Sequence, residues 1–502
     1  MIDHKLNRRF VLKGATALGA AALILPASMT RAAAEPKKGG ILRMGFGHGS
    51  TSDSLDPGSW DNVYAQVFAQ ARHNFLTEIA SDGQLMPEIA ESWEGSDGAA
   101  TWRFKIREGV TFHSGKALTA EDVIASINFH RGEDSKSAAK PIVDAITEIK
   151  AEGSHAIVVT LSAGNADFPF IMSDYHIPMM PAVDGSIDPT STDGCGPYVV
   201  DSYEPGVEAK MTRFADYWKS DRAHFDGLLL LPILDAAARQ NALISGEVDV
   251  IDRVDLNTVH LLKRARGMRV LSVPGTQHYT FIMDSRAAPY TDNNVRMAMK
   301  HAFDREELVE KILNGYGVVG NDHPIGLSNR YHNGDLEQRA YDPDKAKFYL
   351  KEAGLDSLDV TLSAADAAFG GAVDSAVLVS EKAAAAGINV KVQREPNDGY
   401  WSNVWMQKPF VTSYWGGRPT EDWMFSTAYA EGAPWNESYW SHPHFNELLI
   451  GARSELDDDK RRAMYYEMQA IVRDEGSTVI PMFANYVMAM SDKIATPDEI
   501  GA

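Results

Sequence analysis

The segment 413–425, SYWGGRPTEDWMF, combines residue types that suit a small polar ligand. Its tryptophans offer flat apolar faces, and the pair Gly416 and Gly417 lets the backbone approach a bound molecule closely. Arg418 presents a planar guanidinium that pairs with a carboxylate or phosphate through two hydrogen bonds. The segment therefore predicts an anion-binding loop, and an aromatic surface turn is the alternative.

The sequence contains little evidence of a hydrolytic active site. Ser137-Ala-Ala-Lys140 matches the Ser-x-x-Lys of penicillin-recognising enzymes, but no Lys-Thr-Gly follows it in the chain. The sequence also lacks a Gly-x-Ser-x-Gly elbow, a Gly-x-x-x-x-Gly-Lys phosphate loop and a His-Glu-x-x-His metal motif. We therefore predict no enzymatic activity, with a periplasmic hydrolase as the alternative from another class.

Metal ligands are equally sparse. His442-Pro-His444 and His323 are the only suggestive histidines, and we expect Pro443 to hold the first pair apart in an extended, solvated segment. We predict no metal and no cofactor, although a metal complex held through Arg418 would need no direct protein ligand.

Composition limits the partners. A chain of 502 residues predicts two to four domains or lobes, and its 44% hydrophobic residues supply ample core. The formal charge of −21 disfavours nucleic acid and anionic membrane surfaces. The single cysteine, Cys195, excludes an internal disulfide, so stability must come from the core.

The N-terminus is typical of an export signal. Arg8 and Arg9 begin a twin-arginine-like Arg-Arg-Phe-Val-Leu-Lys, followed by a short apolar run and Ala32-Ala-Ala34. We predict a signal at residues 1–34, cleaved after Ala34, with an ordinary Sec signal as the alternative. Because no cysteine lies at the cleavage site, we expect the mature protein free in the periplasm.

Hydrophobic periodicity predicts mixed strands and helices. Strands are expected at Ile41–Phe46 and Thr101–Ile106, with 110–112 as the second arm of a hairpin. Thr119 and Asp122 form a capping box that opens a helix. Further helices are expected from Asp292, from Asp304 and over 459–474. The predicted fold class is α/β in more than one lobe.

Several motifs occur together in a recognisable order. They are Leu55-Asp-Pro57, 85–93 (LMPEIAESW), 102–113 (WRFKIREGVTFH), 118–123 (LTAEDV), 194–198 (GCGPY), 246–250 (GEVDV), 294–305 (NVRMAMKHAFDR) and 342–346 (DPDKA). In this combination the chain resembles the extracytoplasmic solute-binding proteins of ABC transporters, in the family of oligopeptide, dipeptide and nickel receptors (family 5).

The resemblance implies the two-lobed periplasmic binding protein fold of the cluster C type, with a hinge and an inserted subdomain. Mapped on this chain, lobe I comprises 35–62, 190–273 and 471–502. The insertion comprises 63–189 and lobe II comprises 274–470, with both crossings between the lobes in the hinge.

The resemblance also suggests a reversal of ligand charge. In oligopeptide and dipeptide receptors the equivalent loop carries an aspartate that pairs with the peptide amino terminus, and Arg418 stands at the aligned position here. An arginine selects an anionic group. A small carboxylate-, phosphate- or sugar-acid-bearing solute is therefore expected, such as an opine-like or modified amino acid.

Further residues complete the predicted site. Tyr279 and His48 stand where relatives line the cleft, and tryptophans would supply apolar or cation–π walls. Several candidate residues also have an interpretation without a ligand. Trp401 and Trp405 could pack in the core, and His48 could lie in a solvent-exposed turn. Arg418 could form a weak surface pair with Glu421. The candidate ligand-binding residues are Arg418, Trp415, Gly416, Gly417, Tyr414, Asp422, Trp435, Tyr279, His48 and Trp401.

The predicted function is that of a monomeric receptor that binds a small molecule and delivers it to the permease subunits of an ABC transporter. No nucleic acid is expected as a partner. A di- or oligopeptide receptor is the alternative within this class, and it requires an acidic group other than position 418 for the amino terminus.

Overall fold

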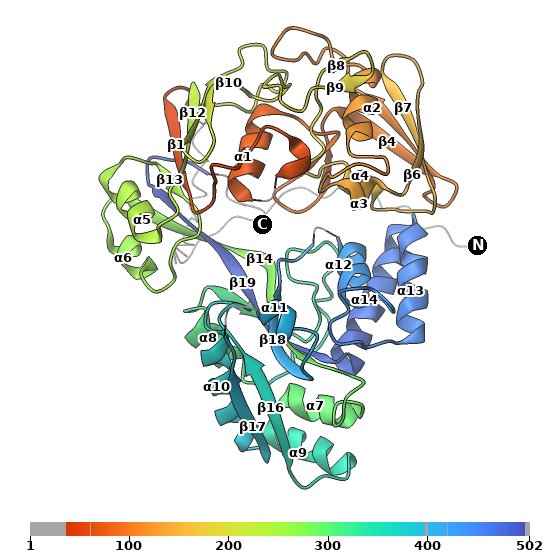
Figure 1. Cartoon of the computed structure of the whole chain (residues 1–502), viewed down its shortest axis with the longest axis vertical. Coiled ribbons are helices and arrows are strands. Elements are labelled where there is room, and N and C mark those ends of the chain that lie inside the picture. Colours follow the sequence, from red (N-terminus) through yellow and green to blue (C-terminus); the bar gives the residue numbers. More distant parts are fainter. Residues whose placement is uncertain (1–36, 61, 397–399, 419, 497–502) are drawn as a thin grey trace, which may run out of the picture. The chain divides into compact units, whose positions relative to one another are not determined.

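The computed structural model describes residues 37–60, 62–396, 400–418 and 420–496. The predicted export signal at 1–34 lies outside these residues. The described chain is a mixed α/β structure, in agreement with the predicted fold class (Figure 1).

One large mixed sheet organises most of the chain. Its strands follow the order β10-β11-β12-β1-β13-β19-β14-β18-β16-β17, and β15 pairs with β19 outside this path. Their bounds are β1 Ile41–Phe46, β10 Tyr198–Glu204, β11 Glu208–Arg213, β12 Gly227–Pro232, β13 Val250–Ile251, β14 Met268–Met283, β15 Gly317–Val319, β16 Leu358–Ala364, β17 Ile388–Arg394, β18 Phe410–Trp415 and β19 Thr478–Ser491.

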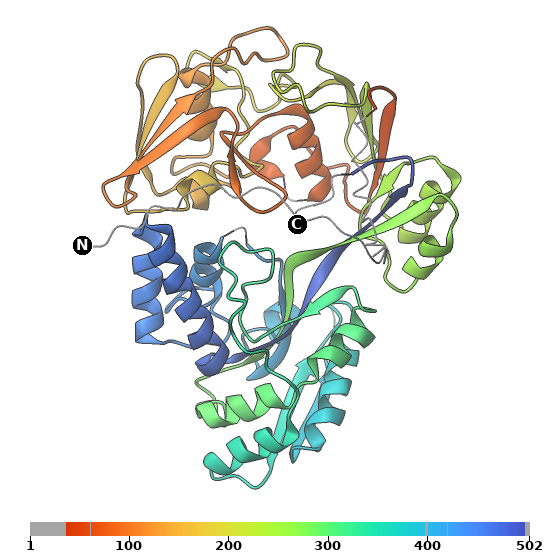
Figure 2. The same cartoon turned by 180° about the vertical axis from the view of Figure 1, so that it is seen from behind.

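The two longest strands join the halves of this sheet. β14 and β19 are antiparallel and run side by side in both views (Figures 1 and 2). The N-terminal part of β14 pairs with β19 next to β13, whereas its C-terminal part also pairs with β18. The register shifts between Pro274 and His278, beside the predicted lobe boundary. This break is the natural place for the proposed hinge.

The first half of the sheet carries three helices. They are α1 Val63–Arg72, α5 Ala236–Ser245 and α6 Val259–Arg264. Tyr64 and Phe68 of α1 pack with Phe46 and Leu230 of the sheet in one apolar cluster. The start of the predicted insertion at residue 63 thus packs against strands predicted for lobe I, and the division into domains stays a proposal.

The second half of the sheet is covered by further helices. They are α7 Asn293–His301, α8 Arg305–Ile312, α9 Pro343–Glu352, α10 Ala372–Ala384, α11 Tyr400–Asn403, α12 Glu421–Ala428, α13 Pro443–Ser454 and α14 Asp458–Glu475. The helices predicted from Asp292, from Asp304 and over 459–474 are confirmed as α7, α8 and α14. Phe425, Phe445, Tyr465 and Val472 pack α12, α13 and α14 together, so α14 stays with these helices across the predicted boundary at 470.

A separate four-stranded antiparallel sheet, in the order β4-β5-β7-β6, lies within 76–195. Its strands are β4 Ala90–Ser96, β5 Thr101–Ile106, β6 Ile146–Ala151 and β7 Ala156–Leu161, with α2 Ala120–Phe129 packed on them. The remaining elements are η1 Pro57–Ser59, β2 Thr77–Ile79, β3 Leu85–Pro87, α3 Lys140–Val143, α4 Phe168–Ile171, β8 Ala182–Val183 and β9 Ser186–Ile187.

Two strand predictions are confirmed and the hairpin is wrong. β1 and β5 have the expected bounds. However, β5 pairs with β4 and β7 rather than with 110–112, where Thr111 forms only an isolated bridge with Ala117. Two flanking strands satisfy β5 on both edges, so the short following segment has no free edge of β5 to join.

Candidate functional site

The predicted ligand loop begins at the C-terminal end of β18. β18 pairs antiparallel with β14, so that Tyr414 lies opposite Tyr279 and Trp415 lies opposite His278. Because successive side chains of a strand point to opposite faces of a sheet, the tyrosines share one face and Trp415 lies on the other. The predicted residues are therefore divided into two groups.

Arg418 belongs to the group around Trp415. Its guanidinium carbon lies 5.5 Å from the Trp415 ring centroid and 5.9 Å from that of Trp423. Nη1 donates a 2.7 Å hydrogen bond to the Gly417 carbonyl. Partial burial lowers the pKa of the guanidinium, yet none of the ion pairs among the described residues includes it. Arg418 is thus a partly desolvated cation on an aromatic platform.

The predicted alternative, a surface pair between Arg418 and Glu421, is wrong. Glu421 is only 3% exposed, and its carboxylate accepts a 2.7 Å hydrogen bond from the backbone N–H of Tyr331. Burial raises the pKa of Glu421 to about 7. Asp422 is also buried and forms a 3.1 Å ion pair with Arg453. Neither carboxylate forms an ion pair with Arg418, and the predicted ligand contact of Asp422 stays a prediction.

The glycine pair has two different roles. Gly417 has a φ of 78°, and a Cβ there would lie 2.2 Å from Thr276 Oγ1, so only glycine allows this close approach. Gly416 is exposed, and a Cβ there would meet no atom within 4 Å. Open space beside Gly416 agrees with the expectation that its backbone is accessible, whereas Gly417 is buried.

Glu437 organises this face of the site, and no sequence motif pointed to it. The buried carboxylate accepts hydrogen bonds from Trp415 Nε1 at 2.8 Å, from Ser413 Oγ at 3.0 Å and from Trp405 Nε1. Trp435 lies beside Trp415, with ring centroids 6.0 Å apart, and remains 50% exposed. A buried acid with three donors fixes the tryptophans in place.

The second group lies around the tyrosine pair. Tyr279 stacks on Phe369 at 4.1 Å between ring centroids, and Tyr414 contacts the Trp401 ring at 5.8 Å. Trp401 also contacts Trp405, and it remains 40% exposed while Tyr414 is 41% exposed. The core-packing interpretation thus accounts for only part of the Trp401 surface.

His48 belongs to another part of the sheet. It lies in the loop after β1, and its imidazole contacts the guanidinium of Arg253 from the loop after β13. Arg253 is exposed. It was not predicted as a site residue, because it lies beyond the motif 246–250 and no other sequence pattern includes it. The two residues are 205 positions apart in the chain.

The structure gives no support to a metal site among the described residues. No group of three or more His, Cys, Asp or Glu side chains in that part of the chain is placed to hold an ion. His442 has an extended backbone and caps α13, whereas His444 lies in the first turn of that helix, because Pro443 begins the helix instead of holding both histidines in one extended segment. His444 is exposed and pairs with Glu467 at 2.8 Å, whereas His323 is buried.

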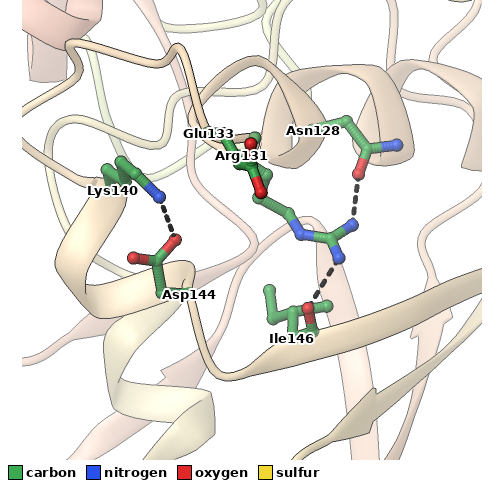
Figure 3. A pocket seen from close by; sticks show the side chains of 7 residues that line it. Asn128, Arg131, Glu133, Lys140, Asp144 and Ile146 are labelled. Atoms are coloured by element: carbon green, nitrogen blue, oxygen red, sulfur yellow. Dashed lines mark hydrogen bonds and ion pairs between the residues drawn. The ribbon is translucent and has the colours of Figure 1, made fainter.

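Ser137 and Lys140, the two residues of the hydrolase-like motif, contact different partners. Ser137 Oγ contacts His130 Nδ1 at 2.6 Å, but burial lowers the pKa of His130 to about 4, which makes it a weak base at neutral pH. Lys140 pairs with Asp144 at 2.6 Å at the rim of a surface cavity of ≈ 490 Å³ (Figure 3). In the same cavity Arg131 is held by Asn128 and by the Ile146 carbonyl. The charges of Lys140 and Arg131 are thus engaged by neighbouring protein groups.

Among the described residues, no helix combines the length and the apolar character that a membrane span requires.

Comparison with known proteins identifies relatives over most of the chain. The model for "Bacterial extracellular solute-binding proteins, family 5 Middle" matches residues 84–437. The dipeptide-binding protein of Escherichia coli strain K12 is 24% identical over 514 residues, covering 88% of this chain and 93% of that protein.

Solved structures share the two-lobed fold. HbpA2 from Haemophilus parasuis matches with a TM-score of 0.80 at 20% identity, covering 90% of this chain and 96% of that chain. AgaA from A. tumefacien R10, in complex with agropinic acid, matches with a TM-score of 0.70 at 22% identity, covering 92% and 96%.

Proposed function

This chain belongs to family 5 of the bacterial extracellular solute-binding proteins, and on that premise we propose that it delivers a small anionic solute to an ABC permease. Receptor function is a property of the family. The anionic character of the ligand rests on the site of this chain. We further propose that residues 1–34 are removed on export to the periplasm, which the mass of the denatured periplasmic protein tests. We also propose that the mature protein is a monomer, which its mass in solution tests.

Arg418 is the observation that carries the ligand class. The guanidinium is partly buried above two tryptophan rings, and no carboxylate of the described residues pairs with it. A desolvated cation favours an anionic partner strongly, because water no longer screens the charge. Aromatic faces beside the cation suit the apolar part of an organic acid.

A di- or oligopeptide ligand is the second candidate, and the dipeptide-binding relative favours it. Such a ligand needs an acidic group for its amino terminus. In the described structure Glu421 is buried against Tyr331 and Asp422 is engaged by Arg453. The candidate acids of the loop are thus committed to internal contacts, which supports the anionic solute over the peptide.

The first experiment is mass spectrometry of small molecules released on denaturing protein purified from its native periplasm. We expect a non-peptide acid, or a modified amino acid, in near-stoichiometric amount. Ordinary peptides with free amino termini would support the peptide receptor instead. Covalent change of an added candidate ligand during incubation would favour the hydrolase, since a receptor releases its ligand unchanged.

We predict that Arg418→Gln lowers the affinity for the released acid roughly 100-fold, equivalent to about 3 kcal/mol, because it leaves the anion without its charged partner. Arg418→Lys should recover part of the loss, since it restores the charge without the bidentate fork. Isothermal titration calorimetry measures both. Arg394→Gln is a matched control, because Arg394 is exposed on β17. Undiminished binding by Arg418→Gln contradicts the proposal.

A further inference from the structure

The loops at one edge of the sheet meet because their strands are parallel. β1 pairs in parallel with both β12 and β13, with Phe46 opposite Pro232 and Gly45 opposite Ile251. The carboxyl ends of all three strands therefore lie at the same edge. The crevice outside the carboxyl ends of parallel strands is where ligands of open α/β sheets generally bind.

A buried arginine fixes the backbone of this edge. Arg239 of α5 is 4% exposed and donates to the carbonyls of Ile233 at 2.6 Å and Arg253 at 2.9 Å. Asp252 accepts a 2.7 Å hydrogen bond from the Gly47 N–H, and it pairs with Arg239 at 3.6 Å. The loops after β1, β12 and β13 are thus tied to one another through protein contacts.

Arg253 holds an uncommon backbone conformation at this edge. Its φ is 46°, in the left-handed region that non-glycine residues adopt only at a cost. Strain of this kind persists where surrounding contacts enforce it, and it is concentrated at binding sites. Here the Arg239 bond to its carbonyl supplies such a contact, while the side chain remains exposed.

The Arg253 side chain contacts His48 and is close to Tyr279. Its guanidinium contacts the His48 imidazole. Burial raises the pKa of Tyr279, and the positive charge of Arg253 acts against this shift, so the two groups are close enough to interact. Asp252, the adjacent acid, accepts from the Gly47 N–H and pairs with Arg239, and its charge also interacts with those of His48 and Arg253, although none of the described ion pairs includes Arg253. Two arginines, Arg239 and Arg253, thus act on this one carboxylate, so one positive charge is left for an acidic group of a ligand.

We propose that Arg253, together with His48, is a second anion anchor, which binds a carboxylate or phosphate group of the ligand at the carboxyl edge of β1, β12 and β13. This inference rests on the proposed receptor function and deepens it. With Arg418 as the first anchor, the ligand carries two acidic groups, one for each arginine. Because Arg418 lies on the Trp415 side and Tyr279 on the other face, near Arg253, the ligand would pass around the C-terminal end of β18 and contact Tyr279 beside the second anchor.

Inorganic sulfate tests the anchor without knowledge of the natural ligand. The probe is the NMR signal of the His48 imidazole Cε1–H. This signal is identified by its absence from the spectrum of the His48→Gln protein, in which Arg253 is unchanged. We expect a saturable shift of this signal when ligand-free protein is titrated with sulfate at constant ionic strength. Arg253→Asn should weaken the apparent sulfate affinity at least tenfold, because asparagine tolerates the left-handed backbone but lacks the guanidinium.

Arg264→Gln is the matched control, since Arg264 is an exposed arginine in the last turn of α6. It should leave the sulfate response unchanged. The anchor is overturned if His48 does not respond to sulfate, or if Arg253→Asn responds as the unmodified protein does.

The released ligand separates this inference from the proposed function. A compound with one acidic group, lost by Arg418→Gln and retained by Arg253→Asn, removes the second anchor and leaves the anionic receptor standing. A compound retained by Arg418→Gln and lost by Arg253→Asn removes Arg418 as the anchor and supports Arg253. A compound with two acidic groups, weakened by both substitutions, supports the complete inference.

Discussion

Arg418 and Glu421 are three residues apart, yet their surroundings give their charges different roles. Arg418 is partly buried against aromatic rings without an acidic partner. Glu421 is buried, and its carboxylate accepts a hydrogen bond from the backbone N–H of Tyr331. Removal from water favours the neutral form of each group. An arginine remains protonated nonetheless, while the carboxyl of Glu421 titrates near neutral pH.

Glu421 should make the stability depend on pH. Its pKa rises from 4.5 to about 7, mainly through burial, with Asp167 raising it further and Arg461 opposing the shift. Between these values the folded state binds more protons than the unfolded state, so stability falls as pH rises through this window. Glu421→Gln mimics the protonated form and removes the dependence. We expect the free energy of unfolding of the unmodified protein to fall relative to Glu421→Gln by about 2–3 kcal/mol from pH 4.5 to 7.5.

Urea unfolding at a series of pH values measures this difference. Since both proteins contain the same histidines, the contributions of those groups cancel. Glu431→Gln is the control, because Glu431 is exposed. A difference between Glu421→Gln and the unmodified protein that stays constant with pH contradicts the prediction.

At the scale of elements, local sequence signals decided where helices begin, and pairing decided which side chains meet. The capping box at the start of α2 is present as predicted. Asp122 accepts from the Thr119 N–H at 2.8 Å, and it also accepts from the Ala182 N–H at 2.7 Å. One residue thus begins a helix and joins it to the β8 segment 60 positions away.

We predict that Asp122→Ala lowers the free energy of unfolding by about 2–4 kcal/mol, because it leaves the buried Ala182 N–H, the partly buried Thr119 N–H and the charge of Lys116 without their acceptor. Glu121→Ala, one position earlier on the exposed face, should cost less than about 0.5 kcal/mol. Thermal unfolding of the two variants compares them. Equal losses would show that Asp122 acts only as a first-turn charge.

At the scale of the molecule, a buried ion pair joins distant parts of the chain. Asp167 precedes α4 and pairs with Arg461 of α14 at 2.6 Å, and both side chains are at most 7% exposed. Beside them the Ala166 N–H donates a 2.7 Å hydrogen bond to the Arg453 carbonyl. Asp422 and Glu421 also face this contact, so its charges are coupled. The contact links α4 to α13 and α14 at a point remote in sequence from β14.

We predict that Asp167→Asn loosens this contact, because Arg461 stays buried without its carboxylate partner. Hydrogen exchange followed by mass spectrometry should show at least tenfold faster exchange in the peptides that contain Ala166. Asp184→Asn is the control, since Asp184 is exposed in the same stretch of chain and Asn tolerates its left-handed backbone. Unchanged protection in Asp167→Asn would assign the stability of this contact to apolar packing alone.

Local sequence patterns were sufficient to predict the elements with strong signals and the family to which the ordered motifs belong. Alternation gave β1 and β5, capping residues gave α2, α7 and α8, and the ordered motifs predicted the two-lobed fold. These signals depend on neighbours two to four residues away, which a linear sequence displays directly.

The surroundings of the candidate site depend on long-range contacts that the sequence does not display. It assigned β5 its true partners, placed Tyr414 and Trp415 on opposite faces, and buried Glu421 away from Arg418. It also introduced Glu437 and Arg253, which no local pattern marks. Burial and pairing arise from contacts between residues as far apart as His48 and Arg253, so the strength of a charge at the site is a property of the folded chain.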